Sequence, residues 1–201
     1  MNGTVFYRDI ILKSCNIDEY SDLVVKCKVI ENEEIGNYLS LVKDDNKFIA
    51  RKVAPVMIRK GFVGEKVNTV LTIERDGRRY NLFEQSNVVK QRDCGVNGVL
   101  SDIVICNFSS DSGEEYVVRP DNFLKAYSLN DDGTYSPISG FRELVLIDED
   151  IMIKTSWGTW AVCLAGSYIV VYDSMRNDYN VLERSAMEKT YKKEINLVRK
   201  R

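Results

Sequence analysis

Histidine is entirely absent from this chain of 201 residues. The absence excludes the serine–histidine and cysteine–histidine pairs of many hydrolases and removes the commonest general base near neutral pH. It also removes a frequent zinc ligand. Catalysis through carboxylates, lysine or tyrosine stays open, so the absence lowers the expectation of an enzyme without deciding it.

Other features are scarce or missing. There are three prolines and twelve glycines, so no collagen-like or linker-like segment is predicted. No apolar run approaches the roughly 18 residues that span a bilayer. The opening letters, MNGTVFYRDIILKSCNI, mix acid and base into the apolar part, which is not typical of a signal peptide. We therefore expect a cytoplasmic protein with no membrane association.

The cysteines do not form a metal-binding pattern. The five of them, with no CxxC pair, are Cys15, Cys27, Cys94, Cys106 and Cys163. An odd count without clustering predicts free, mostly buried thiols in a reducing compartment. The phosphate-binding patterns GxxxxGK[ST] and GxGxxG are absent as well. The sequence predicts no metal and no cofactor.

An internal repeat is the most informative feature that is present. The letters YNLFEQSNVVK (80–90) and YNVLERSAMEK (179–189) agree at five of eleven positions, and the ungapped match extends to 68–90 and 167–189. Each longer segment has a β-branched apolar run, a polar turn and a second alternating run. This pattern predicts a β-hairpin.

Further copies of the unit are weaker. Segment 101–127 has two short apolar runs around the turn SSDSGE, followed by a short predicted helix. Its Phe123 and Tyr127 lie four residues apart, as do Met187 and Tyr191 in the last copy, so each pair shares one helix face. The remaining candidates are a fourth copy over 37–57 and a hairpin with an acidic tip over 143–157.

The repeat predicts the fold class. Hairpins with one apolar face must close on one another, as small barrels or packed sheets. We predict a mainly β (α+β) fold of repeated hairpin and short-helix units, ending in a C-terminal amphipathic helix. The stripe that predicts this last helix consists of Met187, Tyr191, Ile195 and Val198.

The domain division is predicted from turn residues. The stretch SLNDDGTYSPISG (128–140) is the richest in turn-forming residues. It suggests an N-terminal β subdomain of hairpin repeats over 1–130 and a C-terminal hairpin subdomain, ending in the amphipathic helix, over 131–201.

Two segments resemble a group of small bacteriophage proteins sometimes called PGDYG-like. The segments are GEEYVVRPDNFLKAY and GSYIVVYDSMRNDYNVLERSAMEKTY. The shared positions are Glu114, Tyr116, Val118, Phe123 and Tyr127, and in the last copy Tyr168, Tyr179, Val181, Met187 and Tyr191. The Pro-Gly-Asp-Tyr signature itself is replaced by VLSDIV and LAGSYIV. The resemblance implies a phage accessory protein of the host cytoplasm, with no defined activity and no catalytic residues.

Charge is distributed unevenly around a net −2. Residues 43–92 hold twelve Lys and Arg against six Asp and Glu, whereas 93–186 hold six against fifteen. Either the basic stretch forms a face for an acidic partner, or the two halves complement each other within the fold.

Two candidate binding surfaces follow. The first is a basic face for phosphate contacts, formed by Lys47, Arg51, Lys52, Arg59, Lys60, Arg75, Arg78 and Arg79. The second is an aromatic edge formed by Trp157 and Trp160, although tryptophans of this kind are more often core or interface anchors.

The leading hypothesis is a non-catalytic, phage-type binding protein. It would act by contact with a host or viral protein, for instance by inhibiting host machinery. The alternative is a nucleic-acid-binding accessory factor that uses the basic region 47–92. A hydrolase or transferase working through carboxylates is the third hypothesis. The identity of the partner and the oligomeric state stay open.

Overall fold

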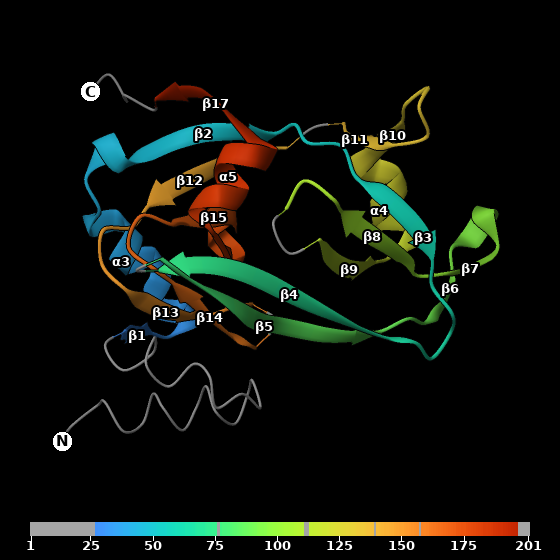
Figure 1. Cartoon of the computed structure of the whole chain (residues 1–201), viewed down its shortest axis with the longest axis horizontal. Coiled ribbons are helices and arrows are strands. Elements are labelled where there is room, and N and C mark those ends of the chain that lie inside the picture. Colours follow the sequence, from blue (N-terminus) through green and yellow to red (C-terminus); the bar gives the residue numbers. More distant parts are fainter. Residues whose placement is uncertain (1–26, 76, 111–112, 139, 157, 197–201) are drawn as a thin grey trace. The chain divides into compact units, whose positions relative to one another are not determined.

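A computed structural model gives the structure of this chain and describes residues 27–75, 77–110, 113–138, 140–156 and 158–196. For 71–75, 78–85 and 195–196 it describes the backbone alone. Strands predominate in the described part, and short helices connect them (Figure 1). The predicted mainly β, α+β class is confirmed. The described strands form sheets of two to five strands and no closed barrel.

The chain divides into two compact units, each built from separate stretches of sequence. Unit 1 comprises the described residues of Met1–Ala50, Phe141–Met187 and Lys193–Arg201, and unit 2 comprises Arg51–Gly140 and Glu188–Lys192. This division differs from the predicted subdomains 1–130 and 131–201. The reason is that strands before residue 51 pair with strands after residue 140, so the middle of the chain forms one unit and both flanks form the other.

One sheet of unit 1 has three strands in the order β1-β13-β14. Strand β1 (Lys28–Ile30) runs parallel to β13 (Ile151–Lys154), which is antiparallel to β14 (Trp160–Cys163). All three residues Ile151, Met152 and Ile153 are fully buried, so this strand is apolar on both faces.

The other sheet has five strands in the order β16-β15-β12-β2-β17. Their bounds are Asp178–Leu182 for β16, Tyr168–Asp173 for β15, Phe141–Leu146 for β12, Lys47–Lys52 for β2 and Tyr191–Asn196 for β17. The helical segments of these stretches are η2 (Asn32–Glu34), α3 (Ile35–Leu41), η3 (Asp44–Asn46), η5 (Ser174–Arg176) and α5 (Arg184–Thr190).

A large cluster of buried side chains lies in the described part of unit 1. Twelve buried side chains pack in one cluster: Ile30, Ile35, Leu39, Val145, Ile147, Ile151, Ile153, Ala161, Cys163, Ile169, Tyr179 and Val181. They come from both sheets, from α3 and, in the case of Ile147, from the residue after β12. Each aliphatic side chain of this size contributes about 1.5–3 kcal/mol when fully buried, so this cluster is the main source of stability in the unit.

Unit 2 is built from hairpins. Its three-stranded antiparallel sheet has the order β3-β8-β9, with β3 at Met57–Lys60, β8 at Ile103–Asn107 and β9 at Glu114–Val118. Three two-stranded hairpins complete it: β4 (Lys66–Arg75) with β5 (Arg78–Val88), β6 (Gln91–Asp93) with β7 (Val99–Ser101), and β10 (Tyr127–Leu129) with β11 (Tyr135–Pro137). The helical segments are η4 (Gly95–Asn97) and α4 (Pro120–Ala126).

Two small, separate clusters of buried side chains lie in the described part of unit 2. One cluster has Val56, Ile105 and Phe123 as its buried members, and the Phe123 ring lies 5.1 Å from Tyr127 and 5.0 Å from Tyr135. The buried members of the second cluster are Val67, Val89 and Val104. Around the first of these clusters, partly buried described side chains outnumber the buried ones.

The repeat is confirmed most fully between segments 101–127 and 167–189. Strands β8 and β9 lead into the seven-residue helix α4, and β15 and β16 lead into the seven-residue helix α5. A matching backbone bond of 2.9 Å opens both helices, from Phe123 N to Arg119 O and from Met187 N to Glu183 O. Both helices end where a tyrosine, Tyr127 or Tyr191, begins the next strand.

Segment 68–90 follows the unit only in part. Strands β4 and β5 form the predicted hairpin, but β5 continues to Val88 where the other copies turn into a helix. Its last residues, Asn87-Val88-Val89, favour a strand, whereas Ala186-Met187-Glu188 at the matching positions favour a helix. The hairpin was therefore predictable from the match, and the helix was not shared.

Two predicted hairpins are wrong. In 37–57 the first half is helix α3, in which Ile35 and Leu39, one helical turn apart, are buried. In 143–157 the strands β12 and β13 form but enter different sheets, so they are not a hairpin. A hydrophobic pattern specifies that a strand forms and not which strand it pairs with.

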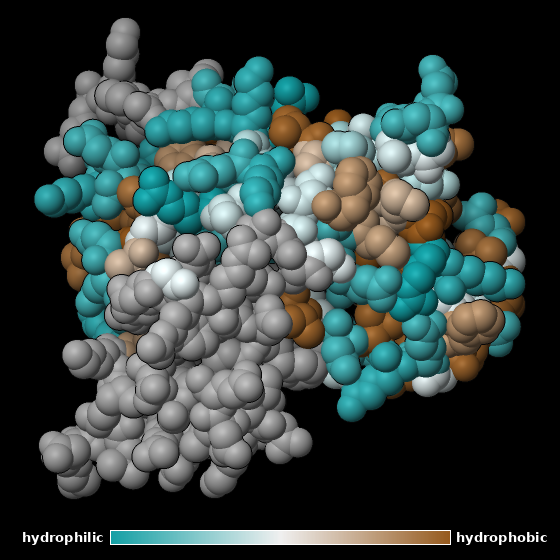
Figure 2. Space-filling view, in the orientation of Figure 1, coloured by the Kyte–Doolittle hydropathy of each residue, from teal (hydrophilic) through white to brown (hydrophobic). Residues whose placement is uncertain are grey.

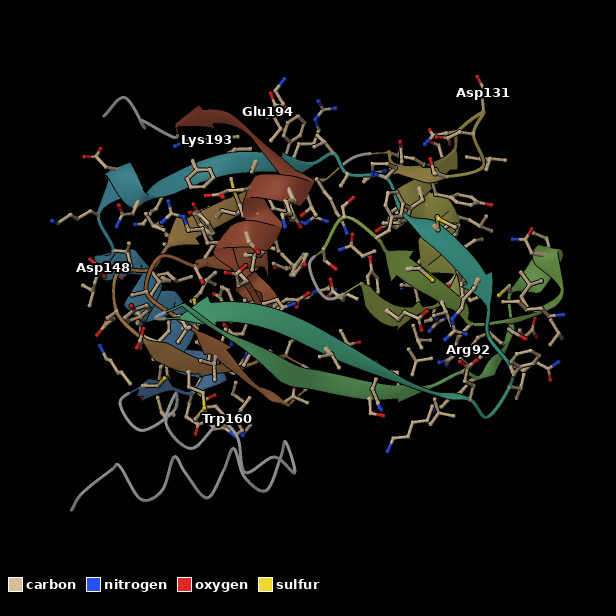
Figure 3. The ribbon with its side chains drawn as sticks, in the orientation of Figure 1. Arg92, Asp131, Asp148, Trp160, Lys193 and Glu194 are labelled. Carbon is tan, nitrogen blue, oxygen red and sulfur yellow. The ribbon has the colours of Figure 1, made fainter. Side chains whose placement is uncertain are left out.

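The C-terminal helix forms over Arg184–Thr190 and is shorter than the predicted stripe. Residues Tyr191–Asn196 are strand β17, beside β2. In this strand the Lys193 ammonium lies 4.3 Å from the centre of the Phe48 ring of β2 (Figure 3). Sheet pairing has overridden the helical pattern of KKEIN.

Candidate binding site

The cations of the predicted basic face are divided between the two units of the chain. Lys47 belongs to unit 1, and the cations of 51–60 belong to unit 2. The other three, Arg75, Arg78 and Arg79, lie at the turn of the β4–β5 hairpin, where Arg75 pairs with Arg78. The side chains of these three arginines fall outside the described residues.

Arg59 is engaged by protein carboxylates. Its Nε and NH2 donate to the two carboxylate oxygens of Glu115 at 2.9 and 2.7 Å, and NH2 also lies 2.7 Å from Glu65 Oε1. The hydrogen bonds from Arg59 lower the pKa of both carboxyl groups, and the bonds to Glu115 raise the pKa of Arg59. Arg59 therefore joins β3, β9 and the loop before β4, and it has little left for a phosphate.

The other members of the basic face differ in their surroundings. The Lys52 ammonium donates to Tyr116 Oη at 3.3 Å and lies 5.7 Å from the centre of that ring. Lys47 pairs with Asp44 at 3.4 Å. Lys60 is exposed and forms no ion pair within the part of the chain that the structure describes. Arg51 is exposed on β2 and is not without an interaction partner.

Of the predicted aromatic edge, only Trp160 lies among the described residues, and Trp157 lies outside them. Trp160 stands on β14 opposite Lys154, whose ammonium is 5.7 Å from the indole ring (Figure 3). Lys154 also lies 3.6 Å from Glu31 Oε2. The half-buried Trp160 therefore packs against its own sheet.

A cavity of about 320 Å³ in unit 2 is lined by cations that lie apart in the sequence. It lies where the end of β5, the start of β6 and the end of β9 meet, and its volume is at the small end of the range of ligand sites. The lining residues are Ser86, Asn87, Val88, Lys90, Arg92, Asp102, Val117 and Arg119. Three cations thus line the cavity against one carboxylate, and Figure 3 marks Arg92.

A buried carboxylate fixes the orientation of Arg92. Asp102 is 2% exposed, and its two oxygens accept from Arg92 Nε at 2.9 Å and from Arg92 NH2 at 3.2 Å. The backbone N–H of Lys90 donates to the same carboxylate at 3.0 Å. These bonds to Asp102 raise the pKa of Arg92, so the guanidinium stays charged. They also satisfy Asp102 and leave NH1 of Arg92 outside this network.

Arg119 is held in the same way by a more exposed carboxylate. Its Nε and NH2 donate to the two oxygens of Asp121 at 3.1 and 3.3 Å, which lowers the pKa of Asp121. Lys90 is exposed and its ammonium makes no ion pair with a described residue. The cavity wall therefore holds two guanidinium groups that use one edge on a protein carboxylate, together with one ammonium.

This cavity was only partly visible in the sequence. Lys90 and Arg92 fall in the basic stretch 43–92, but Arg119 lies in the acidic stretch 93–186. The one local signal was Asp102, a lone carboxylate directly before the apolar strand β8. Its pairing with β6 depends on the β6–β7 hairpin, which the sequence did not predict.

A second feature of unit 2 is an exposed apolar surface around this hairpin. We call it the apolar hairpin surface, and it consists of Phe62, Val63, Val96, Val99 and Leu100. Val96, in η4 at the hairpin tip, is fully exposed, and Phe62 is 73% exposed. Figure 2 shows hydrophobic residues over the right-hand end of the view, where Figure 1 places β6, β7 and the loop between β3 and β4.

Backbone bonds join the two parts of the apolar hairpin surface. The loop that carries Phe62 and Val63 is held to Val89 by bonds from Gly64 N to Val89 O at 2.9 Å and from Val89 N to Glu65 O at 2.8 Å. Strand β6 begins two residues after Val89, and the Asp102 N–H donates a hydrogen bond to Lys90 O at 2.8 Å. The loop and the hairpin therefore leave the body of unit 2 at the same place.

The described residues offer little to other kinds of site. Among them, no group of three or more cysteines and carboxylates is placed to hold a metal ion, and no helix is long and apolar enough to cross a membrane. Comparisons of the chain with protein-family models, with curated proteins and with solved structures find no match.

Proposed function

We propose that this chain is a non-catalytic binding protein of bacteriophage type that contacts a host or viral protein through unit 2. The observation that supports the proposal is the apolar hairpin surface, with five exposed apolar residues on one loop and one hairpin. Exposed apolar side chains gathered on neighbouring segments are typical of interaction sites.

The hairpin is poorly supported by its own unit. Strands β6 and β7 have three residues each and pair only with one another among the described strands. An isolated two-stranded hairpin is marginally stable in water. Because fully burying a Val, Leu or Phe side chain contributes about 1.5–3 kcal/mol, a partner that covers Val96, Val99 and Phe62 would stabilise both the contact and the hairpin.

The chemistry of the partner follows from the rim. Lys60, directly before the loop of Phe62 and Val63, and Lys90, directly before β6, are both exposed. Arg92 lies on β6 itself. Charge complementarity therefore favours a protein with an apolar patch edged by carboxylates. Inhibition of host machinery would follow if that patch is the contact site of another host protein.

A nucleic-acid-binding accessory factor remains the alternative, using cations of the region 47–92. Lys60 and Lys90, exposed and without ion pairs to described residues, support it. Binding through phosphate contacts weakens steeply with salt, whereas apolar contact does not. Loss of DNA or RNA binding in Arg78→Glu/Arg79→Glu would favour this alternative.

Site-specific photo-crosslinking tests the leading proposal. A photoreactive phenylalanine at Val96 should link the full chain to one partner from nuclease-treated lysate of the host. The matched control is the same group at Met175, which is 94% exposed in η5 of unit 1. A partner linked at both positions, or none at Val96, would contradict the proposal.

A charge substitution provides the second arm. The double change Val96→Asp/Val99→Asp should abolish crosslinking from Phe62, because it places charge where the partner's apolar patch would lie. Both side chains are exposed, so the fold should be unaffected, and circular dichroism checks this. Retained crosslinking with an intact fold would also sink the proposal.

A further inference from the structure

We propose that the cavity in unit 2 is a binding site for a phosphoryl group, held by Lys90, Arg92 and Arg119. This site shares Lys90 and Arg92 with the rim of the apolar hairpin surface, adds Arg119, and takes a ligand of different chemistry. It does not depend on the predicted basic face, because Arg59 and Lys52 of that face are engaged within unit 2.

The cations are oriented before any ligand arrives. Arg92 is fixed by three hydrogen bonds that converge on the buried Asp102, two from its own guanidinium and one from the Lys90 backbone. A guanidinium that uses its Nε and NH2 edge on a carboxylate presents NH1 to the other side. Binding therefore costs little side-chain entropy at Arg92, which is a requirement for strong anion recognition.

The lining carboxylate does not oppose an anion. Asp102 is 2% exposed, and both its oxygens accept hydrogen bonds from the wall. Its charge is balanced by Arg92, which leaves the positive charges of Lys90 and Arg119 to act on a ligand. Arg119 is shared with Asp121, an exposed pair that solvent screens.

The number and arrangement of donors favour a phosphoryl group over a carboxylate. A carboxylate presents two oxygens on one edge, which a single guanidinium satisfies. Here an ammonium and two guanidinium groups come from the β5–β6 junction, from β6 and from the residue after β9. A phosphoryl group offers several oxygens in a tetrahedral array and can be shared by all three cations. Asn87 also lines the cavity, and its residue type carries an uncharged amide donor.

The phosphoryl group has two candidate sources, a nucleic-acid backbone and a small phosphorylated compound. Both present the same oxygens to the three cations. A backbone would also extend beyond a cavity of about 320 Å³, whereas a small compound would end inside it. The experiment therefore has one arm for each source.

The first arm is a titration of the full chain with pyrophosphate, followed by amide NMR. The expected result is saturable shifts centred on the amides of Lys90, Arg92 and Asp102, which sodium chloride at equal ionic strength does not reproduce. Shifts spread over both units without saturation would overturn the proposal.

Variants locate the site. Lys90→Gln and Arg119→Gln should each raise the Kd for pyrophosphate about fivefold or more, because each removes a charge-assisted hydrogen bond. The matched control is Arg176→Gln in unit 1, where an exposed arginine likewise pairs with a nearby aspartate, Asp173 at 3.5 Å. It should leave the Kd unchanged within a factor of about two. Equal effects of all three substitutions would overturn the proposal.

Arg92→Gln is a poor test because it leaves Asp102 buried and unpaired, which destabilises the unit. The double change Arg92→Gln/Asp102→Asn removes both charges and serves as a second variant. It should abolish the localised shifts while thermal unfolding shows a folded chain.

The second arm uses a short single-stranded oligothymidylate and fluorescence anisotropy. Tighter binding than pyrophosphate, weakened by Lys90→Gln and Arg119→Gln, identifies a nucleic-acid backbone as the source. Pyrophosphate binding without oligonucleotide binding identifies a small phosphorylated compound. Absence of binding in both arms overturns the proposal.

Discussion

Units 1 and 2 contain the same hairpin in two different settings. In unit 1, β15 and β16 pack into a core of twelve buried residues. In unit 2, β8 and β9 contribute to two clusters that each have three buried members among the described residues. In both, a further antiparallel strand pairs with the first strand of the hairpin, β12 with β15 and β3 with β8. The repeated element is thus a scaffold, and its surroundings decide what it does.

The difference between the two units indicates that stability and binding depend on different parts of the chain. Unit 1 exposes apolar side chains at separate places, such as Leu41, Phe141 and Met175. Unit 2 exposes Phe62, Val96 and Val99 on one loop and one hairpin, and it lines a cavity with cations. Unit 2 also relies on partly exposed ion pairs, such as those of Arg59, which contribute less than apolar burial. We expect unit 1 to carry most of the stability and unit 2 to carry the binding surfaces.

The largest expected effect contrasts one isoleucine in each unit. Ile153 on β13 and Ile105 on β8 are both fully buried. Ile153→Ala should lower the free energy of unfolding by about 4 kcal/mol, because its many buried neighbours cannot close the cavity. Ile105→Ala should cost about 2–3 kcal/mol, since its partly buried neighbours can relax.

Urea unfolding with two probes measures this contrast. Both tryptophans fall in the sequence stretch 141–187, and the described one, Trp160, belongs to unit 1. Their fluorescence therefore follows that stretch, while circular dichroism reports on the whole chain. An equal loss for both variants would contradict the idea that unit 1 has the stronger core.

Particular residues show why the fold was predictable in part. The apolar runs of β8, β15 and β16 and the Pro120 start of α4 carry their structure in local sequence. The parallel pairing of β1 with β13 joins residues more than 100 positions apart, and no local pattern specifies it. The discontinuous units follow from such pairings, so the predicted cut at 130 could not anticipate them.

The next prediction concerns the packing around Gly61, beside the apolar hairpin surface. A Cβ placed on Gly61 would lie 2.8 Å from Val89 Cγ2 and 3.1 Å from Val104 Cγ2, both in a buried cluster. Gly61→Ala should therefore destabilise the chain by about 1–3 kcal/mol through overpacking. Thermal unfolding measures the change, and the double variant Gly61→Ala/Val89→Ala should recover part of it. A neutral Gly61→Ala would show that this cluster is loosely packed.

The candidate site was harder to predict than the fold. Eight cations were assigned to one face from their closeness in sequence, yet Arg59 is engaged by Glu65 and Glu115, and Lys47 belongs to the other unit. Arg119 reaches the cavity from a stretch of opposite net charge. Charge counts along a chain do not show which carboxylate each cation meets, because that depends on strand pairing.

A smaller effect concerns the Arg59 ion pairs of unit 2. Arg59→Gln should lower stability by about 1–2 kcal/mol at neutral pH, since it leaves Glu65 and Glu115 without their cation. The estimate is modest because all three side chains are about a quarter to a third exposed, and solvent screens the charges. The control Arg176→Gln, in an exposed pair of unit 1, should cost less than about 0.5 kcal/mol.

The same variant has a pH signature. Arg59 lowers the pKa of both carboxyl groups in the folded chain, so their stabilisation is complete above the unfolded pKa and is lost as pH falls through the folded pKa. The gap between wild type and Arg59→Gln should therefore narrow as pH falls below about 4. A constant gap from neutral to acidic pH would show that Arg59 acts through packing alone.

The smallest effect places the same glycine substitution in unit 1. A Cβ on Gly36, within helix α3, would lie 3.2 Å from Tyr179 Oη, which is a closer contact than most side chains make. Tyr179 is 1% exposed and cannot move aside freely, so the contact opposes the change. Replacing a helical glycine by alanine favours folding by roughly 1 kcal/mol, and the two effects oppose each other. Gly36→Ala should therefore stay within about 1 kcal/mol of wild type in urea unfolding. A loss as large as that of Gly61→Ala would mean that the core around Tyr179 is as unyielding as the cluster around Val89, and the contrast between the units would then rest on core size alone.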